Sequence, residues 1–157
     1  MSARNWLVHG SLIAVVVAIP RLASAQLPDG SKTPGDTGRV KMEQVCAPGF
    51  VASTTPVPTW ARAEALEGYG IRPETFSSPL DHLVPVSLGG TNSPANLYPF
   101  HPSGAFTLEA KDALAAKLLD MVCSGEVSLK DAQKAFRKDW TRAYGQYMTG
   151  MKAAGGQ

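Results

Sequence analysis

The chain lacks an apolar run long enough to cross a membrane. Its longest unbroken apolar stretch is the eight residues from Leu12 to Ile19, whereas a membrane-spanning helix needs about 20 residues. Arg4 precedes this run and the small residues Ala23-Ser24-Ala25 follow it, which is the arrangement of a secretory signal peptide. A buried N-terminal helix is the alternative. We expect residues 1–25 to be removed and the mature chain to be exported, either to a periplasm or as a secreted protein, without a membrane anchor.

The sequence also lacks an excess of charge of either sign. Lys and Arg number 15 against 13 Asp and Glu, and removal of residues 1–25 would take away Arg4 and Arg21, which leaves 13 of each. Binding to nucleic acids rests largely on Lys and Arg side chains that neutralise phosphates. A neutral mature chain therefore has no overall attraction to DNA or RNA, and any such contact needs a local basic face or a bound cation.

Cysteine is scarce, because the chain contains only Cys46 and Cys123. Without a CxxC spacing, two cysteines make a weak zinc site. In an oxidising compartment an even pair predicts a disulfide. This bridge would close a loop of 77 positions and stabilise the fold by about 4 kcal/mol. Two buried free thiols are the alternative.

The length fits one small domain, and we find no internal repeats. Residues 26–38 are rich in Gly, Pro and Asp, which predicts an extended or mobile arm. Residues 39–150 would form the domain and residues 151–157 a flexible tail. We expect helices at residues 59–67, with Thr59 as N-cap, at 107–124 and from the N-cap Ser128 onward, and short strands at residues 40–46, 80–86 and 96–98. The predicted fold class is α+β, with helices predominating.

The last predicted helix has an apolar face and a basic face. Its apolar residues recur at intervals of three and four, as on the buried side of an amphipathic helix. The basic residues are Lys130, Lys134, Arg137, Lys138 and Arg142. They form either a solvated face or a phosphate-binding one. The aromatic side chains Trp60, Phe136, Trp140 and Tyr144 are expected in the core rather than as platforms for nucleic-acid bases.

The most polar cluster of the chain lies in residues 81–99, DHLVPVSLGGTNSPANLYP. Asp81 and His82 are adjacent, so on a strand their side chains point to opposite faces. Gly89 and Gly90 allow the chain to turn back tightly. Asn96 lies fourteen positions after His82, where a returning strand would face the Asp-His pair.

This cluster resembles the HNH endonuclease superfamily, the ββα-metal nucleases. The resemblance is carried by Asp81-His82-Leu-Val-Pro85, Gly89-Gly90 and Asn96-Leu97-x-Pro99, and it continues through Cys46-Ala-Pro48-Gly49, Lys111-Asp112 and Val122-Cys123-x-Gly125. It spans about residues 27–147 and is similar above all to small HNH-type proteins that bacteria export. It implies a small ββα-metal core with flanking helices.

The resemblance also implies roles for individual residues. His82 would be the general base that takes a proton from the attacking water, and Asp81 would help to ligate a divalent cation. Asn96 would hold the loop so that the histidine is correctly aimed. Oxygen ligands favour Mg²⁺ or Mn²⁺ over Zn²⁺. The substrate would be DNA or RNA, and we expect a monomer.

The third residue of the HNH pattern, which completes the metal site from the following helix, is not a histidine here. Glu109 and His101 are the two candidates for that ligand. Lys111 either neutralises a substrate phosphate or forms an ordinary charged pair with Asp112. The missing histidine and the neutral charge also leave open an inactive cation- or nucleic-acid-binding module on the same scaffold.

Overall fold

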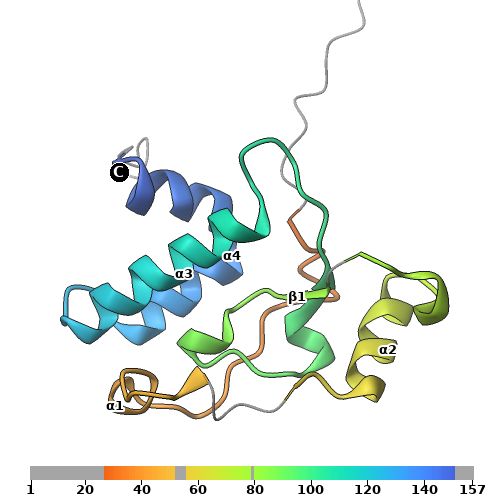
Figure 1. Ribbon diagram of the computed structural model, residues 1–157, viewed down its shortest axis with the longest axis horizontal. Coiled ribbons are helices and arrows are strands. Elements are labelled where there is room, and N and C mark those ends of the chain that lie inside the picture. Colours follow the sequence, from red (N-terminus) through yellow and green to blue (C-terminus); the bar gives the residue numbers. More distant parts are fainter. Residues whose placement is uncertain (1–26, 52–55, 79, 151–157) are drawn as a thin grey trace, which may run out of the picture.

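The computed structural model describes residues 27–51, 56–78 and 80–150 (Figure 1). The predicted signal peptide, residues 1–25, and the predicted tail, residues 151–157, lie outside the described residues. Within the described ranges, no helix is both long and apolar enough to cross a membrane.

The described chain is mixed α and β, with a small two-stranded sheet, as predicted. The helices are α1 (Met42–Val45), α2 (Thr59–Gly68), α3 (Leu108–Cys123) and α4 (Leu129–Met148), and the strands are β1 (Leu80–His82) and β2 (Leu97–Pro99). Short 3₁₀ turns lie between them: η2 (Pro73–Thr75), η3 (Val86–Leu88) and η4 (Pro94–Asn96). In Figure 1, α3 and α4 lie side by side, and α2 lies on the opposite side of the sheet.

The two strands pair antiparallel, with Asp81 opposite Tyr98 and His82 opposite Leu97. Both strands were predicted, but β1 is shorter than residues 80–86 and β2 begins one residue later than expected. One further backbone bond follows His82 in the same register, and the next amide bonds to the side chain of Asn96 instead of to its backbone. The Leu83 amide donates to the Asn96 carbonyl at 2.7 Å, and the Val84 amide donates to the Asn96 side chain.

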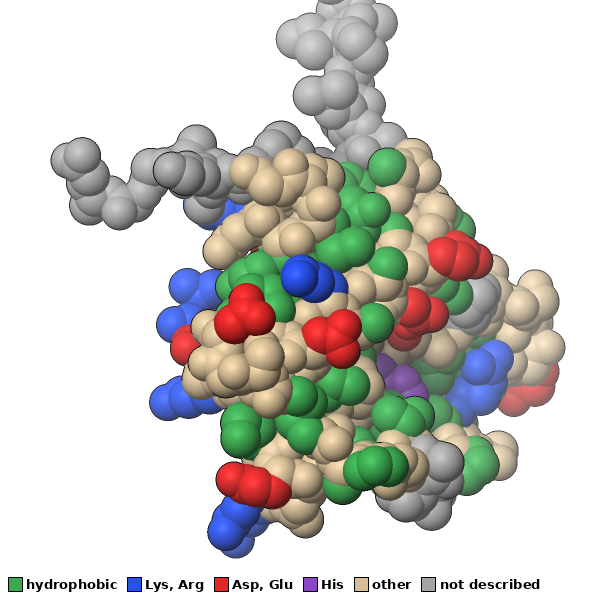
Figure 2. Space-filling model, turned by 60° about the vertical axis from the view of Figure 1, so that its left-hand side comes forward, with side chains coloured by type: hydrophobic (Ala, Val, Ile, Leu, Met, Phe, Trp, Pro, Cys, Tyr) green, Lys and Arg blue, Asp and Glu red, His purple; other side chains and the backbone are tan. Residues whose placement is uncertain are grey.

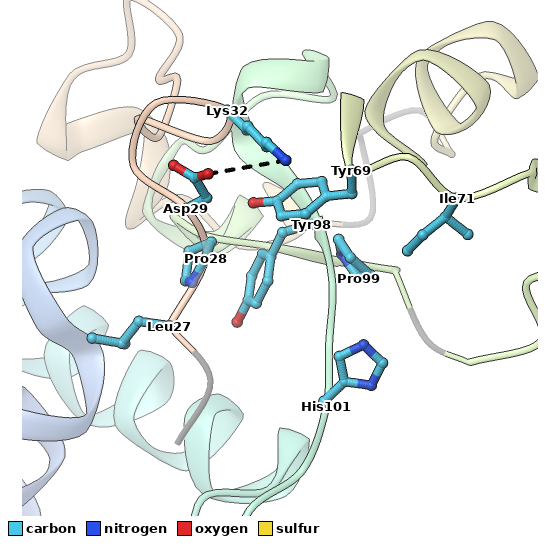
Figure 3. Close-up of a pocket in the computed structure, with 9 residues that line it drawn as sticks. All are labelled: Leu27, Pro28, Asp29, Lys32, Tyr69, Ile71, Tyr98, Pro99 and His101. Carbon is cyan, nitrogen blue, oxygen red and sulfur yellow. Dashed lines mark ion pairs between the residues drawn. The ribbon is translucent and has the colours of Figure 1, made fainter. Parts of the chain in front are cut away.

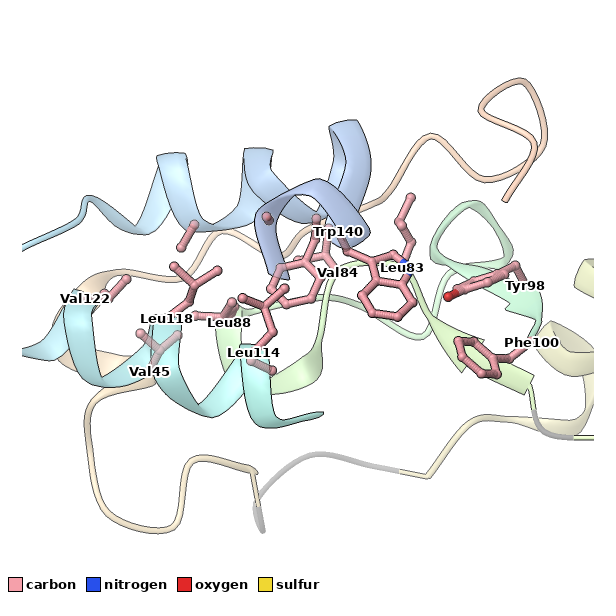
Figure 4. Close-up of a cluster of buried hydrophobic side chains, with 14 residues drawn as sticks. Val45, Leu83, Val84, Leu88, Tyr98, Phe100, Leu114, Leu118, Val122 and Trp140 are labelled. Atoms are coloured by element: carbon pink, nitrogen blue, oxygen red, sulfur yellow. The ribbon is translucent and has the colours of Figure 1, made fainter. Parts of the chain in front are cut away.

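Helix α3 begins and ends, and helix α4 begins, where the sequence predicts. The hydroxyls of Thr107 and Ser128 cap them by accepting from the amides three residues later, at 3.2 and 3.1 Å. After α3, Gly125 adopts a φ of +80°, which suits glycine at a helix C-terminus. Figure 4 shows the core that these helices cover. Its largest buried side chains come from α3, α4 and the hairpin: Leu83, Val84, Leu88, Tyr98, Phe100, Leu114, Leu118, Val122, Phe136 and Trp140.

Helix α4 has a kink at Asp139, whose φ of −172° and ψ of 96° are not helical. The Asp139 Oδ1 accepts from the backbone amides of Thr141 and Arg142, both at 3.0 Å, and from the Thr141 hydroxyl at 2.6 Å. Asp139 thus caps the second half of α4 as an N-cap residue would. Beyond the kink, Trp140 is 1 % exposed and its ring lies 5.6 Å from that of Phe106.

Three local predictions are wrong. Residues 40–46 do not form a strand, because the amides of Val45 and Cys46 bond back to carbonyls four residues earlier and make the single turn α1. The N-cap of α2 is Pro58, and Thr59 is the first helical residue. Trp60 is 63 % exposed instead of buried.

The disulfide between Cys46 and Cys123 is present, with 5.7 Å between the Cα atoms. It joins the residue that follows α1 to the last residue of α3. The prediction from the even cysteine count is confirmed.

The segment of residues 27–38 lies along the hairpin loop and bonds to it. The Gly35 amide donates to the Ala95 carbonyl and the Gly38 amide to the Gly89 carbonyl, both at 2.9 Å. The buried Thr33 hydroxyl donates to the Leu97 carbonyl at 3.0 Å. This segment thus supports the loop that connects β1 to β2.

Candidate functional site

Asp81 and Lys111 form an ion pair between β1 and α3. The Lys111 Nζ lies 2.7 Å from Asp81 Oδ2 and also donates to the backbone carbonyl of His82. Lys111 is only 2 % exposed, and its ammonium lies 5.5 Å from the ring centroid of Phe136 and 5.9 Å from that of Tyr98. Burial lowers the pKa of Lys111, and the Asp81 carboxylate opposes this shift.

Tyr98 is the cross-strand partner of Asp81 and is fully buried. Burial, followed by the nearby Asp81 carboxylate, raises the pKa of Tyr98 far above its ordinary value. The phenol is therefore neutral throughout the usual pH range, and Lys111 is the cation that balances Asp81.

His82 is held by a hydrogen bond to a side chain of the loop. Its Nε2 lies 2.8 Å from the Oδ1 of Asn92, and the Nδ2 of Asn92 donates to the Pro56 carbonyl at 3.3 Å. Because a carbonyl only accepts, the Asn92 amide must turn its nitrogen to Pro56 and its oxygen to His82. The neutral imidazole therefore carries its proton on Nε2 and has its lone pair on Nδ1.

Asn96 closes the loop through its side chain, which is 0 % exposed. Its Oδ1 accepts from the Val84 amide at 2.9 Å. Its Nδ2 donates to the carbonyls of Val84 at 3.0 Å and Thr91 at 2.9 Å. These three bonds are all to the loop backbone, the contacts expected of a residue that fixes the position of His82.

The loop packs against itself at Gly90. A Cβ atom at this position would lie 1.8 Å from the Val84 carbonyl oxygen and 2.9 Å from Asn96 Nδ2. Only glycine permits this approach, which explains why the second glycine of the Gly-Gly pair is needed.

A cavity of about 390 Å³ opens beside the Asp-His pair. Its polar lining comprises Asp81, His82, Ser87, Lys111 and Asp112. The hairpin and α3 thus bring Asp81, His82 and Lys111 together around one cavity. Asn96 lies behind the loop, buried, and is not among the lining residues.

The two predicted third ligands lie elsewhere. Glu109 is exposed on the first turn of α3, where hydrogen bonding by Thr107 lowers its pKa, and it does not line this cavity. His101 lines a different cavity of about 380 Å³, together with Tyr69, Tyr98 and the Asp29–Lys32 ion pair (Figure 3). Neither candidate shares the cavity of Asp81 and His82.

Asp112 does share that cavity, although it was not among the predicted ligands. Partial burial, followed by the carboxylate of Asp81, raises the pKa of Asp112, as expected for two acids near each other. The sequence offered one signal for Asp112, its position directly after Lys111. Lys111 lies three residues before Leu114 and belongs with it to the buried stripe of α3.

The donors around the cavity fit a hard cation with few protein ligands. Among the described residues, no three or more His, Cys, Asp or Glu side chains are grouped to hold a metal ion. Mg²⁺, however, is usually bound by one or two carboxylates together with waters and substrate phosphates. Asp81 and Asp112 meet this requirement, because a carboxylate has more lone pairs than one ion pair uses.

Comparison with known proteins identifies no relative of this chain. No family model, curated protein or solved structure matches this chain. The candidate site consequently rests on its own geometry and on the resemblance of its motifs.

The basic residues of α4 lie outside this cavity. Lys130, Lys134, Lys138 and Arg142 are exposed, and Arg137 donates to the Thr37 hydroxyl at 3.5 Å. On the face shown in Figure 2, basic and acidic side chains are interspersed. A phosphate-binding role for the basic residues of α4 stays a prediction.

Proposed function

We propose that this chain is an HNH-type endonuclease that hydrolyses phosphodiester bonds in DNA or RNA. The observation that supports it best is the convergence of Asp81, His82 and Asp112 on one cavity, beside a hairpin that Asn96 closes. Strand, loop, strand and helix follow one another in the order of the ββα-metal nucleases. The disulfide is compatible with the proposed export to a periplasm or to the medium.

His82 is the proposed general base. With Nε2 committed to Asn92, Nδ1 is the nitrogen that accepts a proton from a water molecule. The Lys111 contact to the His82 carbonyl and the three bonds of Asn96 hold the backbone from which the imidazole projects. The imidazole is therefore positioned by groups of the protein itself.

Asp81 and Asp112 are the residues that would hold a divalent cation, Mg²⁺ or Mn²⁺, at this site. When bound, such an ion supplies positive charge to the phosphate and to the leaving oxygen. The mature chain has no net charge of its own to attract nucleic acid. A bound cation would consequently supply the positive charge that attracts a substrate phosphate to the proposed site.

A second function, a cation- or nucleic-acid-binding module without catalysis, is favoured by one observation. The Asp81 carboxylate already has Lys111 at 2.7 Å, which reduces what it offers to a metal ion. Calorimetric titration combined with a cleavage assay separates the two functions, because the module binds a cation or nucleic acid and cleaves nothing.

The direct test uses the purified mature chain with its disulfide formed, plasmid DNA or RNA, and Mg²⁺ or Mn²⁺. We expect nicking or degradation, and we expect His82→Ala to lower the rate by about 10²–10⁴-fold, the usual contribution of a general base. His101→Ala is the matched control, because His101 lies outside the cavity, and it should cleave at the wild-type rate. Equal cleavage by His82→Ala, with its fold intact by circular dichroism, would remove His82 as the base.

A further inference from the structure

Lys111 occupies a place that is unusual for a lysine. It lies on the buried stripe of α3 that continues through Leu114, Leu118 and Val122. Lysine is almost never fully buried unless it is paired, and here the pair is Asp81, at 2.7 Å. The helix therefore brings a positive charge into the interior at the position of the proposed site.

The groups around this ammonium are of the kinds that bind cations. It contacts a carboxylate oxygen of Asp81 and the carbonyl oxygen of His82, and the rings of Phe136 and Tyr98 lie within 6 Å. Carboxylate and carbonyl oxygens are also the donors that hard metal ions prefer. Lys111 and a divalent ion consequently compete for the carboxylate of Asp81.

We propose that Lys111 is an internal cation that holds Asp81 and His82 in position and keeps the affinity of the site for divalent metal ions low. The proposal rests on the proposed function for the identity of the metal ion, but it concerns binding alone. A divalent ion about 5 Å from an ammonium loses more than tenfold in affinity even at the dielectric constant of water. The loss is larger in the partly buried setting of Asp81.

The test measures Mn²⁺ affinity by isothermal titration calorimetry on the full mature chain. Lys111→Met removes the charge and keeps most of the side-chain length, and it should bind Mn²⁺ at least tenfold more tightly than the wild type. Lys117→Met is the matched control, because Lys117 is an exposed lysine of the same helix, and it should bind like the wild type. The double variant Asp81→Asn/Lys111→Met lacks both charges and should lose the gain in affinity.

Stability provides a second readout, because a ligand that binds only the folded state raises the melting temperature. Mn²⁺ should raise the melting temperature of Lys111→Met more than that of the wild type. If Lys111→Met is unfolded without metal, Mn²⁺ should restore its fold, and Lys111→Gln, which retains a donor, should behave in the same way.

Equal Mn²⁺ affinity in the wild type and Lys111→Met would overturn the proposal. So would failure of both neutral variants to fold in the presence of Mn²⁺, since the cation could then not take the place of the ammonium. Neither readout uses cleavage, so a chain that cuts no nucleic acid can still support this role of Lys111. An active nuclease can equally refute it.

Discussion

The side chain of Asn96 is expected to contribute more to stability than any other single amide of the hairpin. It makes three hydrogen bonds to the loop backbone and is 0 % exposed. Asn96→Ala would leave the Val84 amide and two carbonyls without these partners. Each buried group left unsatisfied costs about 1–3 kcal/mol, so with three such groups we expect a loss of at least about 3 kcal/mol in the free energy of unfolding.

Asn96→Asp distinguishes the contribution of the donated hydrogen bonds to stability from that of side-chain volume, because it keeps the volume and removes the donor. The aspartate retains an acceptor for the Val84 amide, but at neutral pH it turns a carboxylate oxygen toward the carbonyls of Val84 and Thr91, where the wild type has a donor. We expect this nearly isosteric variant to lose at least as much stability as Asn96→Ala at pH 7.

Urea unfolding followed by tryptophan fluorescence measures these losses. Trp140 is buried at 1 % exposure and reports loss of the core, whereas Trp60 is already exposed in the folded state. A loss below about 1 kcal/mol for both variants would refute the reasoning, because it would mean that the loop closes without the Asn96 side chain.

Two further predictions concern the disulfide and the close approach at Gly90. Reduction, or the double substitution Cys46→Ser/Cys123→Ser, should lower the free energy of unfolding by about 4 kcal/mol, because the bridge closes a loop of 77 residues; mass spectrometry of the oxidised chain should find it two hydrogens lighter, and unchanged urea unfolding on reduction would contradict the estimate. Gly90→Ala should destabilise by about 3 kcal/mol or more, since its Cβ would lie 1.8 Å from a carbonyl oxygen. Gly68→Ala, where nothing lies within 4 Å of the added atom, should be neutral or stabilising by thermal denaturation, and equal effects of the two substitutions would contradict the packing argument.

The helical part of the fold could be predicted from sequence because its signals are local. The hydroxyls of Thr107 and Ser128 and the glycine at position 125 lie within a turn of the backbone groups that they cap. The bounds of the two short strands and the identity of α1 had no such signal. Strands of three residues are too short to show an alternating pattern, and α1 is a single turn whose identity depends on hydrogen bonds rather than on periodicity.

The site was predictable where the chemistry lies within one motif and not where it depends on a distant partner. Asp81, His82 and Asn96 belong to one hairpin, in which Asp81 and His82 line the cavity and Asn96 lies behind it, bonded to the loop backbone. Lys111 was interpreted either as a residue that neutralises a substrate phosphate or as the charged partner of Asp112, whereas its ammonium pairs with Asp81. Its burial follows from Asp81, which is thirty residues earlier in the chain.

The two predicted candidates for the third ligand were chosen by sequence spacing, which does not show which side chains reach the cavity of His82. Glu109 and His101 are near Lys111 in sequence, but the rotation of α3 turns Glu109 outward and the path after β2 carries His101 to another cavity. Asp112 is one residue from Lys111 and reaches the cavity of His82. The choice among acids in one helical turn depends on the orientation of the helix, which packing decides.

The bridge between Cys46 and Cys123 turns residues 46–123 into a covalent cycle. Both strands, α2, α3 and every polar residue that lines the cavity of His82 lie inside this cycle, whereas residues 27–45 and α4 lie outside it. A single cut by a protease within the cycle therefore leaves one connected molecule, whose pieces separate only on reduction. A cut between α3 and α4 is held by packing alone. In a compartment where proteases are abundant, the part of the chain with the candidate chemistry is the part that survives a first cleavage as one covalent unit.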